Sequence, residues 1–200
     1  MLALPAAPAP ERKHSLLVGT AFGVAAGAAA FSGLLSTYLV ERQQVLDALG
    51  QAGKPVSFLP RGVVMPGIPA NIMLVVMVFA SVMARWAVYA LRQGERRHTA
   101  FAIGLTVLFG AGALNLQVAV YRALDVGVRS SQFATLFYGV TGAFLIALLV
   151  GMAFAVITAF RSLGGRYAAT DTDGVEAFAL YWHFLTVAFA ATWFVVYVNK

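Results

Sequence analysis

Apolar stretches of twenty residues or more recur along this sequence, and they limit the folds it can adopt more than any other feature. A helix rises about 1.5 Å per residue, so each stretch is long enough to cross the roughly 30 Å hydrocarbon core of a bilayer. The stretches lack the alternation of polar and apolar positions that is typical of barrel strands. The sequence therefore predicts an all-α fold, a polytopic membrane helical bundle.

The composition agrees with a chain whose solvent is lipid, because 60% of its 200 residues are hydrophobic and only 11% are charged. The chain has no cysteine, which excludes disulfides, iron–sulfur clusters, thiolate zinc sites and thioether-attached haem. The net charge of +6 comes from arginines and lysines in the loops beside the apolar stretches. This placement indicates contact with lipid headgroups and not with nucleic acid.

We expect five transmembrane helices in a single domain, residues 15–200, after a disordered cytoplasmic amino-terminal segment, residues 1–14. The expected helices are Leu16–Leu39, Ala70–Leu91, Ala100–Val120, Phe133–Phe160 and Val175–Val198. The connection Glu41–Pro69 is rich in glycine and proline, which predicts an ordered surface loop with a short helical start at Gln43–Leu49.

The orientation follows from the basic residues that flank the expected helices. Arg12 and Lys13 precede the first helix, and Arg92, Arg96 and Arg97 lie in the short connection between the second and third. Such clusters favour the cytoplasmic side of a membrane. We therefore expect a cytoplasmic amino terminus and, after five spans, a carboxy terminus outside.

Four glycines, Gly19, Gly23, Gly27 and Gly33, lie in the first expected helix. The first three are spaced by four residues and so stack on one face. A face without side chains lets another helix approach closely, which is a common way for membrane helices to associate. We expect these glycines to mediate helix packing.

Ionisable groups within the membrane are costly and therefore informative. Arg85 lies about two turns from the end of the second helix, close enough to extend its guanidinium to the interface. Glu176 begins the fifth helix, where a carboxylate suits the positive end of the helix dipole. No carboxylate occupies the middle of an expected span, so a proton pump or a sodium-coupled carrier built from this chain alone is not expected.

The chain has three histidines, His14, His98 and His183. His14 and His98 lie at basic ends of expected helices, and His183 alone lies within a span. A haem with two protein ligands or a copper site needs several converging histidines or methionines. We therefore expect no metal ligand, no cofactor-binding residue and no catalytic residue in this chain.

Polar and aromatic side chains gather near the ends of two expected helices. Gln117, Tyr121 and Arg122 end the third helix, and Tyr181, Trp182 and His183 lie near the start of the fifth. Polar atoms at such positions need partners on a neighbouring helix or on a lipid. We expect these six residues to make lipid contacts or interhelical polar contacts.

Several of these segments are similar to a known family, and they occur in the family's order. The segments are Gly33-Leu34 with Tyr38 and Arg42; Gln117-Val118-Ala119-Val120-Tyr121-Arg122; Phe137-Tyr138 with Thr141-Gly142; and Tyr181-Trp182-His183-Phe184 with Trp193 and Val196-Tyr197. Together they resemble subunit III of haem-copper oxidases, in the short five-helix form found in bacteria. The last segment, which matches the family's carboxy-terminal motif, is the most specific.

The chain departs from this family at several polar positions. Gly27 and Val120 stand where the family has glutamates, and Thr186 stands where it has an aspartate. Phe144 and Ala147 stand where it has histidines. The family's polar groups are associated with bound phospholipid and with proton uptake by the neighbouring catalytic subunit. The chain therefore resembles a divergent member, in which the packing role depends mainly on apolar faces and glycines.

The resemblance implies a non-catalytic accessory subunit of a respiratory haem-copper terminal oxidase, in a bacterial plasma membrane. It implies partnership with catalytic subunit I and other subunits, haem and copper in that partner, and phospholipid as the ligand of this chain. Three alternatives stay open: an accessory subunit of a nitric oxide reductase, a free-standing small membrane transporter, and an assembly factor that binds the oxidase transiently. A transporter would need a water-lined polar pathway, for which these helices supply few buried charges.

Overall fold

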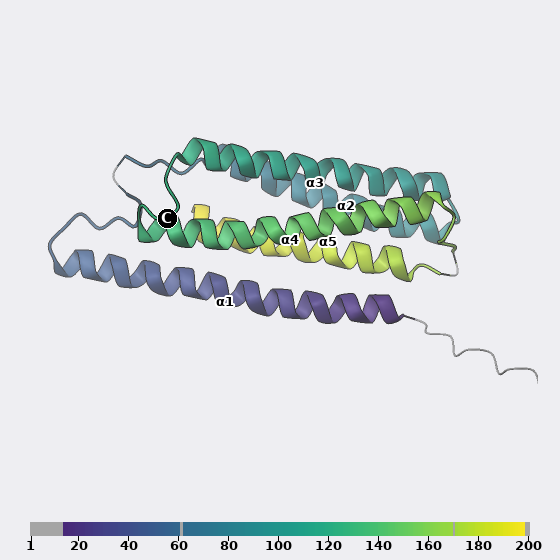
Figure 1. Ribbon diagram of the computed structural model, residues 1–200, viewed down its shortest axis with the longest axis horizontal. Coiled ribbons are helices and arrows are strands. Elements are labelled where there is room, and N and C mark those ends of the chain that lie inside the picture. The colour runs from purple at the N-terminus through teal and green to yellow at the C-terminus, as the bar shows by residue number, and fades with distance from the viewer. Residues whose placement is uncertain (1–13, 61, 170, 199–200) are drawn as a thin grey trace, which may run out of the picture.

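A computed structural model describes residues 14–60, 62–169 and 171–198, which form five long helices (Figure 1). These are α1 (Ser15–Gln51), α2 (Gly67–Arg92), α3 (Arg96–Leu124), α4 (Gln132–Leu163) and α5 (Asp173–Trp193), and α5 continues into a short π-helix, η1 (Phe194–Val198). Each of the five is long and apolar enough to cross a membrane. The predicted multi-pass helical bundle is confirmed.

The helix boundaries agree with the sequence within a few residues, with one exception. The first helix does not end at Leu39 but runs to Gln51, so Gln43–Leu49 is part of α1 and not a separate helical start. The segment between Val40 and Leu49 contains good helix formers and neither glycine nor proline, so nothing interrupts the helix there. The expected disordered segment, residues 1–14, lies outside the described residues except for His14.

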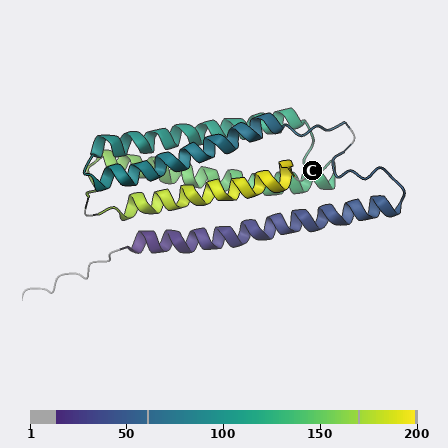
Figure 2. The same ribbon diagram turned by 180° about the vertical axis from the view of Figure 1, so that it is seen from behind.

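Four of the helices form a closed ring, in which α2 packs on α3, α3 on α4, α4 on α5, and α5 on α2. The remaining helix, α1, lies beside this ring along α5 and α4, and it projects beyond the ring at its own carboxy-terminal end (Figures 1 and 2). The molecule is thus a four-helix core with a long fifth helix along one side.

The two ends of the bundle differ in how they are held. The starts of α1, α3 and α5 meet the ends of α2 and α4 at one end, which we call the His14 end. At the other end, which we call the Phe58 end, Phe58 of the α1–α2 connection packs against Tyr38 and Phe133 with ring centroids 5.7 and 5.6 Å apart. Aromatic packing at this end anchors the connection to α1 and α4.

Large side chains of α5 fill much of the interior of the ring. Trp182, Phe178 and Phe189 are fully buried, and small residues on the facing helices, including Gly110 of α3 and Gly151 of α4, make room for the large rings and side chains of α5. Close packing of large against small side chains gives membrane helices most of their mutual attraction, because lipid supplies no hydrophobic driving force. α5 is therefore the organising helix of the bundle.

Candidate functional site

The glycines of α1 have different surroundings. A Cβ atom added at Gly27 would lie 2.7 Å from the ring of Phe184, so the lack of a side chain there lets α5 approach α1. Gly19, Gly23 and Gly33 are exposed, and an added Cβ would meet nothing within 4 Å among the described residues. Of these four glycines, Gly27 alone closely approaches another helix of the described structure, and the other three leave an open face on α1.

Two further glycines, which the sequence pattern alone does not distinguish, pack more tightly. A Cβ at Gly110 would collide with the sulfur of Met152 and lie 2.7 Å from Trp182 Cη2. A Cβ at Gly151 would lie 2.7 Å from Leu185 and 3.0 Å from Tyr181. In the sequence each of them is an isolated glycine within an apolar run. Their contact with the bulky side chains of the fifth helix could be predicted only if the neighbours of each helix were known.

The three residues Tyr181, Trp182 and His183 of α5 point in different directions. Trp182 points into the core and is fully buried, while the hydroxyl of Tyr181 donates a hydrogen bond to the carbonyl of Ala147 on α4 (3.0 Å). A hydrogen bond joins the His183 ring to the hydroxyl of Ser81 on α2. Tyr181 and His183 thus bind α5 to α4 and to α2.

A second polar cluster lies between α3, α4 and η1. The Tyr121 hydroxyl donates to Thr141 Oγ1 of α4 (3.0 Å), and Thr141 donates in turn to the Phe137 carbonyl (2.6 Å). Gln117 is fully buried beside Tyr121 and Tyr197, and its amide atoms make no hydrogen bond of regular geometry within the described part of the chain. Arg122, the remaining member of the predicted group, is exposed.

The positions at which the resemblance implies polar groups are filled mainly by packing. Val120 and Phe144 are fully buried in the two hydrophobic clusters of the bundle. Thr186 donates a hydrogen bond to the Met77 carbonyl of α2 (3.0 Å), and the Ala147 carbonyl accepts the bond from Tyr181. Apolar contacts and helix-to-helix hydrogen bonds occupy the positions where the resemblance implies ionisable groups.

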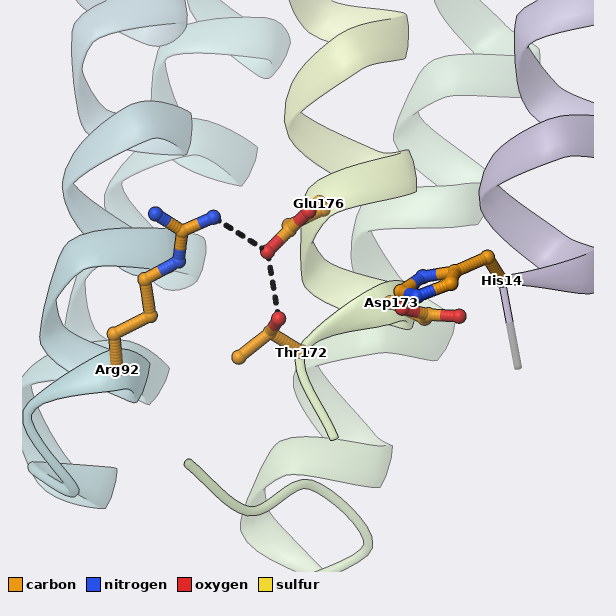
Figure 3. Close-up of polar contacts among 5 residues, drawn as sticks. All are labelled: His14, Arg92, Thr172, Asp173 and Glu176. Atoms are coloured by element: carbon orange, nitrogen blue, oxygen red, sulfur yellow. Dashed lines mark hydrogen bonds and ion pairs between the residues drawn. The ribbon is translucent and has the colours of Figure 1, made fainter. Parts of the chain in front are cut away.

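An ion-pair cluster joins three helices at the His14 end (Figure 3). The Glu176 carboxylate of α5 accepts hydrogen bonds from Arg92 Nη2 at the end of α2 (2.8 Å) and from Thr172 Oγ1 (2.6 Å). Next to it, the Asp173 carboxylate accepts a bond from His14 Nδ1 at the start of α1 (2.7 Å). The sequence predicted only the helix-dipole role of Glu176, because the partners lie 84 and 159 residues apart.

The three histidines do not converge on one another. His14 contacts Asp173 of α5, His98 contacts Glu95 one turn before it, and His183 contacts Ser81 of α2. Over the described ranges, no group of three histidine or carboxylate side chains is arranged to hold a metal ion. What the described arrangement offers chemically is helix packing and polar contacts between helices.

Comparison with known proteins agrees with this architecture. The family model described as Cytochrome c oxidase subunit III matches residues 12–199. Among individual proteins, the chain is 28% identical to the cytochrome c oxidase subunit 3 of Synechocystis sp. over 183 residues, which cover 91% of this chain and 75% of that protein.

Animal proteins of the same name match a shorter part. The chain is 31% identical over 122 residues to the subunit 3 of Lumbricus terrestris and 27% identical over 124 residues to that of Bos taurus. These matches cover 61% and 62% of this chain and 47% and 46% of the relatives, so the chain spans about half the length of the animal proteins it matches. The family model, by contrast, extends over every residue of the five helices. The chain belongs to the cytochrome c oxidase subunit III family.

Proposed function

We propose that this chain is a non-catalytic accessory subunit of a respiratory haem-copper terminal oxidase. The observation that carries the proposal is the family match over residues 12–199, which includes all five helices. In this role the chain packs against catalytic subunit I and stabilises it, while haem and copper belong to that partner. The scattered placement of His14, His98 and His183 supports a role outside the redox chemistry.

The open face of α1 is the part of the molecule that best suits the packing role. Gly19, Gly23 and Gly33 lie on it without neighbours among the described residues, and Phe22 is 74% exposed between them. Small residues permit close approach of a second helix, and a projecting aromatic ring gives that helix something to pack against. We assign this face to the contact with the catalytic subunit.

The experiment that tests the proposal is purification of the tagged chain in a gentle detergent, followed by an optical spectrum and mass identification of what accompanies it. The expected result is haem absorbance together with a large multi-helix subunit, and the spectrum then separates an oxygen reductase from a nitric oxide reductase. A colourless chain that purifies alone would overturn the proposal. An assembly factor would appear as copurification with immature, haem-free partner only.

The same proposal places the chain in a bacterial plasma membrane, with the His14 end in the cytoplasm. Because the chain has no cysteine, single cysteines report topology without background. Gln93→Cys lies at the His14 end and Ala52→Cys at the Phe58 end, and both positions are exposed. In intact cells an impermeant maleimide should label Ala52→Cys and leave Gln93→Cys unlabelled; the reverse pattern would invert the orientation.

A further inference from the structure

The outer surface of α2 carries a hollow of about 510 Å³ that the packing of the bundle does not use. Its lining residues are Ser81, Val82, Arg85, Trp86 and Tyr89 of α2, with His183 of α5. The spacing of three and four residues places the α2 members on one side of that helix. α2 and α5 lie next to each other on the side seen in Figure 2, and the hydrogen bond between Ser81 and His183 joins them within the hollow.

Arg85 is the charged group of this hollow, and its charge is not paired by a hydrogen-bonding partner. Its side chain is exposed and makes no hydrogen bond or ion pair within the described residues. The Glu176 carboxylate lies within electrostatic range, but its bonds go to Arg92 and Thr172. An arginine in a transmembrane helix is costly unless it reaches water or an anion. The described residues give Arg85 no hydrogen-bonded anion, so its guanidinium is open to an anion from the surroundings.

The depth of Arg85 suits the phosphate level of a bilayer. It lies seven residues before the end of α2 at Arg92, which is roughly 10 Å along the helix axis. α2 has 26 residues and is longer than the hydrocarbon core is thick, so part of that distance lies outside the core. A long, flexible side chain at this depth extends its charged head toward the lipid headgroups.

The surface next to the hollow is apolar and suits contact with an acyl chain. Val75, Val78 and Val82 follow the same side of α2 away from Arg85 toward the membrane centre, and they are 53%, 48% and 52% exposed. The ten residues from Val75 to Arg85 span roughly 15 Å, about half of the hydrocarbon core. Trp86 and Tyr89, the latter 61% exposed, add the aromatic rings typical of the interface.

We propose that this hollow binds one anionic phospholipid, whose phosphate pairs with Arg85 and whose acyl chain lies on the three valines. Arg92 is already paired with Glu176, so Arg85 is the positive charge left for the ligand, which favours a lipid with a net negative charge over a zwitterionic one. The Ser81–His183 pair and the Tyr89 hydroxyl lie where the glycerol and the headgroup need neutral polar contacts. The site adds a lipid ligand to the proposed accessory-subunit role, and it does not depend on assembly with an oxidase.

Trp86 lies in the hollow and reports directly on the lipid that occupies it. The purified chain is placed in phosphatidylcholine vesicles that contain a minor fraction of bromine-labelled phosphatidylglycerol or, separately, the same fraction of bromine-labelled phosphatidylcholine. Bromine quenches tryptophan fluorescence on contact. The expected result is stronger quenching by the brominated phosphatidylglycerol, and this excess should disappear when Trp86→Phe removes the reporter.

Charge variants separate a specific site from general attraction to an anionic membrane. Arg85→Gln should abolish the excess quenching, and Arg85→Lys should keep part of it. The matched control is Arg166→Gln, which removes one exposed positive charge from the same end of the molecule and should leave the excess unchanged. Equal quenching of the unaltered chain by the two brominated lipids would overturn the proposal. This measurement does not depend on whether any variant folds.

Two further outcomes also decide the question. If Arg85→Gln and Arg166→Gln reduce the excess equally, the lipid is attracted by the surface charge as a whole and the site is wrong. If Arg85→Gln keeps the excess but loses copurifying protein, Arg85 pairs with a partner's carboxylate and the lipid proposal fails. Thermal unfolding of each variant in detergent checks that loss of quenching is not loss of the fold.

Discussion

α1 and α5 lie side by side, yet they relate to the rest of the chain in opposite ways. In the most apolar 18-residue window of each helix, 6% of the α1 residues are buried inside the chain, against 39% in α5. α5 contacts α1, α2 and α4 and carries the buried Trp182, whereas α1 contacts the ring along one side only. α5 thus packs inside the bundle, and α1 presents a long surface outward.

Glycine shows the same difference at the level of single residues. Gly110 and Gly151 admit the large side chains of α5 into the core, where an added methyl group has no room. On α1, Gly23 and its neighbours face open space, and Gly27 alone meets the flexible end of the Phe184 side chain. Identical residues therefore support internal packing in one region and leave an exposed surface in the other.

The largest effect is expected for Gly110→Leu. The new side chain would collide with Met152 and Trp182, and overpacking of a tight core costs about 1–3 kcal/mol. Unfolding of the purified chain in detergent, followed by the near-ultraviolet signal of its tryptophans, measures this loss. Gly104→Leu is the matched control on the same helix, because a Cβ there meets nothing within 4 Å of the described structure. Equal losses in the two variants would contradict the packing described for α3 and α5.

Two substitutions on α1 distinguish its face toward α5 from its exposed face. Gly27→Leu should lower the unfolding midpoint of the isolated chain by less than Gly110→Leu does, because the far end of the Phe184 side chain can move aside. Gly23→Leu should leave that midpoint unchanged and instead reduce the amount of catalytic subunit recovered with the chain. If Gly23→Leu destabilises the isolated chain as much as Gly27→Leu, the outer face of α1 is not free as described.

A smaller effect is expected when the ion pair between α2 and α5 is broken. Glu176→Gln removes the charge that Arg92 and Thr172 contact, and both sides of the pair are partly exposed, so the expected cost is at most about 1 kcal/mol. The loss should shrink as salt is added, because screening weakens the pair in the unaltered chain. Unfolding at low and high salt measures it, with Glu95→Gln, which removes an exposed carboxylate beside His98, as the control.

The smallest effect concerns the start of α1. His14→Ala removes the contact with Asp173, the hydrogen bond that ties the first turn of α1 to α5 in the described structure. We expect faster amide hydrogen exchange near Ser15 and no change in the unfolding midpoint, because the rest of α1 stays packed through Phe31. Asp173→Asn should have the same local effect, and a global loss of stability in either variant would show that α1 is part of the core.

The sequence predicted the number, type and approximate limits of the helices, because the length of an apolar run is a local property. It placed the end of the first helix too early, since hydropathy marks where the membrane span ends and not where helical backbone ends at Gln51. It did not reveal that Ser81 meets His183, that Arg92 meets Glu176, or that Gly110 faces Trp182. Those contacts depend on which helices are neighbours and on how each is rotated, and neither is encoded in one apolar run.

The central claim, that α1 presents a partner-facing surface while the other four helices form a self-contained core, can be tested most directly by photo-crosslinking in native membranes. A photoreactive amino acid replaces Phe22 on α1, which is 74% exposed, or Leu108 on α3, which is 64% exposed. The account predicts that Phe22 crosslinks to a large, haem-containing membrane subunit and that Leu108 gives no such product. Crosslinking to that subunit from Leu108 and not from Phe22 would contradict it.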